Sequence, residues 1–329
     1  MAETAVPIRF VYRSASMIPL LTIMQGRGLW EREGLDVRHM EFTQDPAYAE
    51  ERLFAGDIDF IFGNHVSPYL RLSQGHPIVC LAQSTNWMQT WIATSPDVTE
   101  LSMLKGKRVL SKPLFLPDGK FSGHNWGNYL LMLELNGVKV KEDIDYLDPD
   151  EIEALYQGSS SAEKGIAAVK DGRASACFIN TERGAAAEAA GLRVHRLPET
   201  PMIHSITLTT TTPRVQKDST FAERIIKALL EAVHIFKTDR ETTLALLANP
   251  VQPLGDRYVE RLRDRYDHYA GEYDSRLLPR AEAILNVHKL ACLAYPGSEK
   301  VNPMELWDLH YLRQILDSGY VDRMYGKEA

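Results

Sequence analysis

Short apolar and β-branched runs alternate with segments of helical periodicity through the first two thirds of the chain. The runs predict strands near residues 8–12, 36–40, 58–62, 78–82, 90–93, 108–110, 175–179 and 193–197. Apolar residues spaced by three and four predict helices at 18–33, 46–55, 68–74, 126–136, 150–156, 162–170 and 182–190. This alternation predicts an α/β fold with mostly parallel sheets.

The pattern becomes helical after about residue 218. One apolar stripe runs through Phe221, Ile225, Leu229, Val233 and Phe236. Further helices are expected near residues 239–248, 255–269, 279–293 and 303–317. The last third is therefore predicted to be a layer of helices.

Two helix starts carry capping signals. Asp148 and Thr220 each stand three residues before a glutamate, which predicts a capping box at both positions, and Pro149 suits a first helical residue. These signals place helix starts at residues 149 and 221.

One internal echo bears on the architecture. Segments 56–64 and 172–180 both run from glycine through an apolar strand to asparagine, with the same spacing of eight residues. Either the chain uses one strand-helix plan twice, with Asn64 and Asn180 at the carboxyl ends of strands, or the match is chance at a common helix-to-strand junction. The first interpretation predicts two lobes with a cleft between their rims.

Composition narrows the classes of function. The chain has 329 residues and a formal net charge of −7, and 44% of its residues are apolar, which predicts one large or two smaller soluble domains. The acidic balance argues against a nucleic-acid or anionic-membrane partner. Cys80, Cys177 and Cys292 lie far apart, so we expect reduced thiols rather than a disulfide framework or a zinc site.

The compartment stays open at this point. We expect no membrane span, because no apolar run approaches the necessary length. Residues 17–24 are the nearest approach to a leader, but Pro19 interrupts them and no small-residue cleavage site follows. The protein is extracytoplasmic if a leader was removed before residue 2 and cytoplasmic if Met1 is the native start.

A family resemblance becomes specific at residues 28–37 (GLWEREGLDV) and 53–60 (LFAGDIDF), and it continues at 101–109, 165–178, 221–238 and 301–316. These segments resemble the sulfonate, nitrate and taurine substrate-binding proteins of ABC importers. The superfamily also contains the hydroxymethylpyrimidine synthase of thiamine biosynthesis and an aromatic desulfinase. The resemblance covers nearly the whole chain.

The resemblance implies a type II periplasmic-binding-protein fold, with two α/β lobes that close on a ligand by a hinge motion. We expect lobe 1 to comprise residues 1–93 and 208–329, and lobe 2 residues 94–207. The two crossover segments are expected near 92–95 and 205–211.

Candidate ligand-binding residues follow the predicted strands, because loops at the carboxyl ends of strands bind ligands in open α/β sheets. In lobe 1 they are Ser14, Ser16, Met17, Asn64, His65, Asn86 and Trp87, with His204 beside the second crossing. In lobe 2 they are Lys112, Ser122, Gly123, His124, Asn125, Trp126, Asn180 and Glu182.

Two of these groups suggest chemistry. Residues 122–125 open a predicted helix, where free N–H groups with hydroxyl and amide donors form either an anion site or an ordinary N-cap. His65 lies between a strand and a helix that Ser67 could cap, and it could orient a carboxylate, act as a general acid or base, or make a structural hydrogen bond. Trp87 and Trp126 could sandwich an aromatic ligand or belong to the core.

The sequence lacks the H-E-x-x-H zinc motif, a phosphate-binding loop, a dinucleotide fingerprint and a nucleophile elbow, so we expect no metal and no cofactor. Ile61 stands four residues before His65, where the pyrimidine synthase has a lysine, and residues 14–16 hold no cysteine for a desulfinase. Cys80 and Cys177 are expected to be buried small hydrophobes.

We therefore expect a solute-binding protein for a small anionic or aromatic ligand, with an ABC permease as partner. The alternative is a cytoplasmic enzyme on the same scaffold, in which His65 assists proton transfer or decarboxylation.

Overall fold

The computed structural model describes residues 5–156, 160–254 and 256–326. The chain divides into two compact units, of which unit 1 is Met1–Trp87, Met202–Ala291 and Gly297–Ala329, and unit 2 is Met88–Pro201 and Cys292–Pro296. The divisions at 87/88 and 201/202 lie six residues before the lobe boundaries expected from the sequence.

Unit 1 is built on a five-stranded sheet of order β2-β1-β3-β10-β4. Its strands are β1 (Val6–Tyr12), β2 (Leu35–Phe42), β3 (Phe60–Phe62), β4 (Ile78–Met88) and β10 (Thr200–Thr211). Its helices are α1 (Ile18–Gly26), α2 (Leu29–Arg32), α3 (Pro46–Ala55), α4 (Pro68–Ser73), α9 (Thr212–Lys217), α10 (Ser219–Thr238), α11 (Arg240–Leu246), α12 (Asp256–Asp264), α13 (Tyr266–Glu272), α14 (Ala281–Ala294), α15 (His310–Asp317) and α16 (Tyr320–Met324), with short 3-10 helices η1 (Ala15–Met17), η4 (Ser298–Lys300) and η5 (Pro303–Leu306). The last turn of α14, from Cys292, belongs to unit 2.

Unit 2 has a second five-stranded sheet, of order β7-β6-β8-β5-β9. Its strands are β5 (Trp91–Thr94), β6 (Lys107–Leu110), β7 (Ile144–Leu147), β8 (Ala176–Ile179) and β9 (Arg193–Arg196). Its helices are α5 (His124–Leu135), α6 (Pro149–Glu153), α7 (Ser161–Lys170) and α8 (Gly184–Ala189), with 3-10 helices η2 (Leu101–Leu104) and η3 (Thr181–Arg183).

The two sheets follow one plan. In unit 1, β1 pairs in parallel with β2 and β3, and β3 pairs antiparallel with β10 on its other side. In unit 2, β6 pairs in parallel with β7 and β8, and β8 pairs antiparallel with β5. The structure thus confirms the repeat inferred from the two Gly-to-Asn segments.

The repeat extends to single hydrogen bonds. Gly56 and Gly172 both adopt positive φ, of 75° and 70°, where a residue without Cβ is favoured. Three residues after each glycine, the N–H of Asp59 donates to the Arg9 carbonyl, and the N–H of Ser175 donates to the Arg108 carbonyl, both at 2.7 Å. Glycine at these two junctions therefore sets how the backbone enters β3 in unit 1 and β8 in unit 2.

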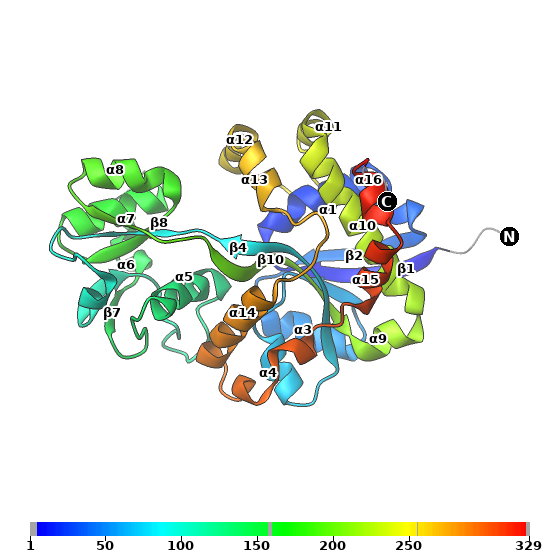
Figure 1. Ribbon diagram of the computed structural model, residues 1–329, viewed down its shortest axis with the longest axis horizontal. Helices are drawn as coiled ribbons and strands as arrows, with labels where there is room; N and C mark the ends of the chain where they lie inside the picture. The colour runs from blue at the N-terminus through cyan, green and yellow to red at the C-terminus, as the bar shows by residue number, and fades with distance from the viewer. Residues whose placement is uncertain (1–4, 157–159, 255, 327–329) are drawn as a thin grey trace. The chain divides into compact units, whose positions relative to one another are not determined.

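Helices cover both faces of the sheet in unit 1 (Figure 1). The apolar stripe predicted for residues 221–236 lies on α10 and is buried, and it packs with α1 against the sheet at Phe10, Phe60 and Phe62. Phe10 and Phe60 stack with their ring centroids 4.7 Å apart. Unit 2 has a smaller core of its own around Leu110, Ile166 and Cys177. Among the described residues, no helix has both the length and the apolar character needed to cross a membrane.

Several expectations about local structure need correction. The helix predicted over 18–33 is two helices, since Gly28 between them adopts a left-handed conformation with φ of 60°. The capping box at Asp148 is confirmed, but the cap of α10 is Asp218 rather than Thr220, whose N–H donates to the Asp218 carboxylate.

The segments 92–95 and 205–211, expected to cross between lobes, belong largely to strands. Ile92 pairs with Phe178 and His195 in the sheet of unit 2, and Leu208 pairs with Phe62 in the sheet of unit 1. Strands β7 and β10 and helices α9 and α16 were not predicted. The threonine-rich end of β10 is buried, and its hydroxyls donate to carbonyls, as Thr209 does to Asn64.

Candidate functional site

Asn64 follows the central strand β3 and is fully buried in a polar network. Its side-chain N–H donates to Glu50 on α3 at 2.8 Å, and its carbonyl oxygen accepts a hydrogen bond from Arg13 at 2.7 Å. Glu50, itself 1% exposed, also accepts from the Ser67 hydroxyl and from Arg71. Ser67 makes this contact and does not cap α4. The network holds the loop after β3 in one conformation.

His65 is connected by a threonine to a buried glutamine. The Gln83 side-chain N–H donates to the backbone carbonyls of Thr85 and His204, at 2.6 and 2.7 Å, so its oxygen faces Thr207. The Thr207 hydroxyl donates its single proton to that oxygen. The same hydroxyl lies 3.1 Å from His65 Nδ1, and because its proton is already donated to Gln83 it can only accept there. Nδ1 of His65 therefore carries a proton, and in the neutral imidazole the lone pair is on Nε2.

His204 and Ser205 mark a distorted point in β10. Nε2 of His204 lies 2.6 Å from the Trp87 carbonyl and Nδ1 lies 3.0 Å from the Ser205 hydroxyl. Burial lowers the pKa of His204 below its ordinary value, so its neutral form is favoured. Ser205 has a φ of 62°, and its carbonyl lies 3.0 Å from where a Cβ on Gly63 would stand. Backbone strain of this kind persists only where surrounding contacts fix it.

Asn86 and Trp87 contact the loop between α13 and α14. The Asn86 side chain donates to the Leu278 carbonyl at 2.8 Å and accepts from the Arg280 N–H at 2.9 Å. The Arg280 guanidinium lies over the Trp87 ring, 4.7 Å from its centroid. Both predicted residues therefore fix this loop to β4.

The predicted group at residues 14–17 divides into two environments. The hydroxyls of Ser14 and Ser16 lie 2.7 Å apart, and the Ser14 oxygen also accepts the Ser16 N–H and caps η1. Met17 is 1% exposed and packs in the core of unit 1. Of the predicted residues Ser14, Ser16 and Met17, the two serines present polar side-chain atoms after β1.

A pocket of about 510 Å³ lies in unit 2 at the carboxyl ends of β6 and β8. Three of the predicted residues, Asn125, Trp126 and Asn180, line it. The location agrees with the rule that ligands bind beyond the carboxyl ends of strands in open α/β sheets.

The start of α5 borders this pocket and has two properties of an anion site. Helix α5 begins at His124 after Gly123, and no side chain caps it. The neighbouring Ser122 hydroxyl is buried and has no hydrogen-bond partner among the described residues. An uncapped helix start offers N–H donors and a partial positive charge, and a buried hydroxyl without a partner is unfavourable unless a ligand supplies one.

Trp126 forms one wall of the pocket together with two aromatic side chains that the sequence did not indicate, Tyr129 and Phe178. Tyr129 stacks on Phe178 with centroids 5.0 Å apart, and Trp126 meets Tyr129 edge to face at 5.9 Å. Tyr129 stands four residues after Asn125, on the same face of α5, so helical spacing could have identified it. Such a wall suits an apolar or aromatic ligand body.

Two charged residues predicted for the site, Lys112 and Glu182, do not line the pocket and already have partners. Lys112 donates to Asp150 at 2.6 Å and lies 3.5 Å from Asp148, and its hydrogen bond to Asp150 raises the pKa of Lys112. Lys164, a lining residue that the sequence did not indicate, pairs with Glu153. Glu182 accepts from Asn180 at 3.3 Å. Any net attraction for an anion in this pocket therefore comes mainly from the start of α5.

Neither thiol predicted to be buried is placed for nucleophilic chemistry. Cys80 and Cys177 are almost fully buried, as expected, and burial raises the pKa of each thiol to about 12. In the part of the chain that the structure describes, no three His, Cys, Asp or Glu side chains are arranged to hold a metal ion.

Comparisons with known proteins bear on this arrangement. A family model described as "ABC transporter, phosphonate, periplasmic substrate-binding protein" matches residues 15–245. No curated protein matches the sequence. Among solved structures, the periplasmic aliphatic sulphonate binding protein SsuA from Escherichia coli aligns over 92% of this chain and 96% of its own, with 19% identity and a TM-score of 0.58.

Two further structures are similar over most of their length. A putative sulfonate-binding SsuA from Methylobacillus flagellatus KT covers 98% of this chain and 97% of its own, with 15% identity and a TM-score of 0.64. The nitrate-binding protein NrtA from Synechocystis PCC 6803 covers 95% and 89%, with 12% identity and a TM-score of 0.53. At these identities the likeness concerns the fold, which is the type II periplasmic-binding-protein fold expected from the sequence.

Proposed function

The chain belongs to the family of periplasmic substrate-binding proteins of phosphonate ABC transporters, and from this premise we propose that it binds one small organic anion for delivery to a membrane permease. The proposed head group is a phosphonate, sulfonate or carboxylate. The proposed body is small and at least partly apolar.

The start of α5 is the observation that carries this proposal. Its uncapped N–H groups and the buried Ser122 hydroxyl together offer donors without a formal positive charge. Hydrogen bonds to charged groups contribute about 1.5–3 kcal/mol each, so a few of them suffice to bind an anion even though the protein carries a net charge of −7.

The aromatic wall supports the second half of the proposal. Trp126, Tyr129 and Phe178 present ring surface beside the polar start of α5. The pocket volume of about 510 Å³ falls within the range of about 300–1,000 Å³ that is typical of small-molecule sites. In unit 1, the polar atoms of Ser14, Ser16 and His65 are proposed to contribute to the same function.

Calorimetric titration tests the proposal with methylphosphonate, phenylphosphonate, ethanesulfonate and benzoate. We expect one head-group class to bind, and Ser122→Ala to weaken that binding about tenfold, by the loss of one hydrogen bond to a charged group. Ser102→Ala, at an exposed position of helix η2 in the same unit, is the matched control and should bind as the wild type does. If none of the four anions binds, or if both variants bind equally well, the proposal is wrong.

One observation favours an enzyme as the second candidate. Neutral His65 carries its lone pair on Nε2, which is the form of imidazole that accepts a proton. Mass spectrometry of the bound anion after prolonged incubation separates the two functions. An unchanged anion identifies a binding protein, whereas a changed mass that also requires His65 identifies an enzyme.

A further inference from the structure

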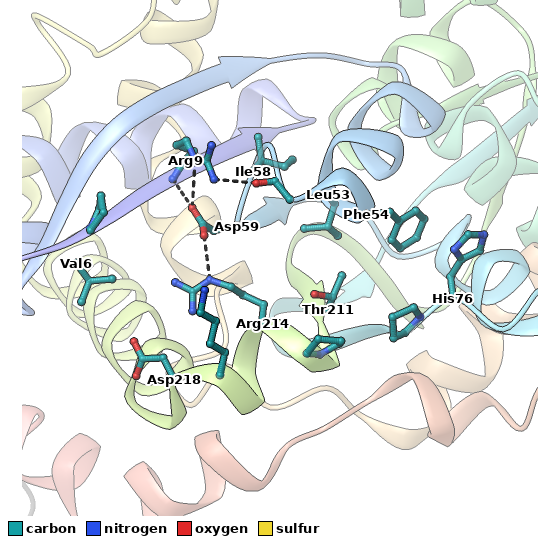
Figure 2. Close-up of a pocket in the computed structure, with 15 residues that line it drawn as sticks. Val6, Arg9, Leu53, Phe54, Ile58, Asp59, His76, Thr211, Arg214 and Asp218 are labelled. Atoms are coloured by element: carbon teal, nitrogen blue, oxygen red, sulfur yellow. Dashed lines mark hydrogen bonds and ion pairs between the residues drawn. The ribbon is translucent and has the colours of Figure 1, made fainter.

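Unit 1 contains a pocket of about 820 Å³, which Figure 2 shows with its lining residues. It lies at the opposite end of the parallel strands from Asn64 and His65. It lies at the amino-terminal ends of β1 and β3, near Val6 and Ile58, whereas Asn64 and His65 follow the carboxyl end of β3. The end of β10 and helix α9 complete its lining. The site proposed above for solute uptake does not include this pocket.

One wall of the pocket is apolar. Leu53 and Ile58 are 4% and 2% exposed, and Phe54 stacks on His76 with ring centroids 4.4 Å apart. The wall is completed by Val6 and by three prolines, Pro7, Pro77 and Pro213. Because proline has no backbone N–H, this wall offers few donors and suits an apolar ligand body.

The other part of the pocket is charged, and Figure 2 shows Asp59 between Arg9 and Arg214. One Asp59 oxygen accepts from Arg214 Nε at 2.9 Å, and the other accepts from the Arg9 backbone N–H at 2.8 Å. The Asp59 side chain is only 12% exposed, so its charge is largely taken up by these contacts. The two guanidinium groups leave one positive charge in excess.

Donors remain in this part of the pocket. Arg214 uses its Nε for Asp59 and its guanidinium stacks on the Phe221 ring, 3.5 Å from the centroid, while its terminal N–H groups have no hydrogen-bond partner among the described residues. Lys217 lines the same end, is exposed, and has no ion-pair partner in the described chain. With Asp218 counted, three cations face two carboxylates, a net charge of +1.

We propose that this pocket is a second binding site, and that it takes an amphiphilic organic anion such as a medium-chain carboxylate. The hydrocarbon tail lies on Phe54, Leu53 and Ile58, and the carboxylate is held by Lys217 and Arg214. Each CH₂ group of the tail that is buried strengthens binding about fourfold, and the cations select a charged head over a neutral one.

Titration with octanoate, below the concentration at which it forms micelles, tests the site. Methyl-labelled protein should show shifts of the Leu53, Ile58 and Val6 signals, and 1-octanol should bind at least about fivefold more weakly than octanoate. Lys217→Glu should weaken octanoate binding about fivefold, and Phe54→Ala about tenfold. The matched controls are Lys170→Glu on α7 of unit 2 and Phe42→Ala, an exposed phenylalanine of unit 1 outside the pocket.

Three results would overturn the proposal. The first is no octanoate binding, and the second is equal binding of octanol, which would remove the role of the cations. The third is methyl shifts confined to Ile152 and Ile179, which lie in the pocket of unit 2. Binding of the anion identified for the solute site is expected to be unchanged in Lys217→Glu, so this test and the test of the proposed function can fail separately.

Discussion

Thr207 links two buried polar groups, and its replacement by valine tests the tautomer assigned to His65. Valine has nearly the same shape, so the change removes a hydroxyl without creating a cavity. It leaves the Gln83 side-chain oxygen and His65 Nδ1–H without the hydroxyl that now lies within 3.1 Å of each. All three residues are at most 1% exposed, so water does not replace the lost hydroxyl.

The magnitude follows from the two buried groups that lose the Thr207 hydroxyl. A buried donor or acceptor that loses its partner costs about 1–3 kcal/mol, so two groups cost about 2–6 kcal/mol, and we expect about 4 kcal/mol for Thr207→Val. Thr207→Ser keeps the hydroxyl and loses one methyl group, which costs about 1 kcal/mol. Urea unfolding measures both values, as a shift of the midpoint at unchanged slope.

The tautomer of His65 can also be observed directly by NMR. The ¹⁵N spectrum of the wild-type imidazole should show a protonated Nδ1 and an unprotonated Nε2 for His65, and Thr207→Ser should retain that pattern. If Thr207→Val costs no more than Thr207→Ser, or if the wild-type proton is on Nε2, the hydrogen-bond assignment is refuted.

Three further predictions concern buried ionisable groups. Glu50→Gln should destabilise the protein by about 3 kcal/mol, because it removes the charge that pairs with Arg71. Glu51→Gln, at an exposed position, is the control, and equal urea midpoints for the two variants would contradict the predicted loss of stability. Burial lowers the pKa of His204, so the unfolded chain takes up a proton that the folded chain does not, and the free energy of unfolding should fall as the pH falls below about 6.5. His204→Gln should make that fall shallower, without abolishing it because His195 and His234 are lowered too; an unchanged slope would argue against the effect. Cys80 and Cys177, each with a pKa of about 12, should resist iodoacetamide at pH 8 until the chain is unfolded, and rapid labelling of either in the native protein would show that it is accessible.

Local signals predicted many elements because one short segment contained all the information needed. Helix α3 spans Pro46–Ala55 as expected, since Asp45 caps it, Pro46 suits its first turn and Gly56 ends it with positive φ. By contrast, β10 was missed because its threonine hydroxyls are satisfied by distant carbonyls, such as that of Asn64, and no local pattern reveals such partners.

The candidate site likewise contains some residues that local sequence predicts and others whose role depends on distant contacts. Asn125, Trp126 and Asn180 were predicted from their positions after strands, and the structure brings them to one pocket. Phe178 was read only as part of a strand, because its stacking on Tyr129 depends on how α5 lies over the sheet. The contacts of Asn64 with Glu50 also join residues far apart in sequence, so strand order alone could not separate a rim position from a buried one.

Strand β10 lies between β3 and β4 in the sheet of unit 1 but comes after all the other strands in the sequence, and this order affects folding during synthesis. The open edge of β3 at Ile61 and Phe62 is completed only when Leu208 and Thr209 have been synthesised. Every strand of the sheet in unit 2 lies between those two points in the chain. On the ribosome, unit 2 therefore has all its strands before unit 1 can close its sheet, and the apolar edge of β3 stays unpaired for the time it takes to translate about 150 residues.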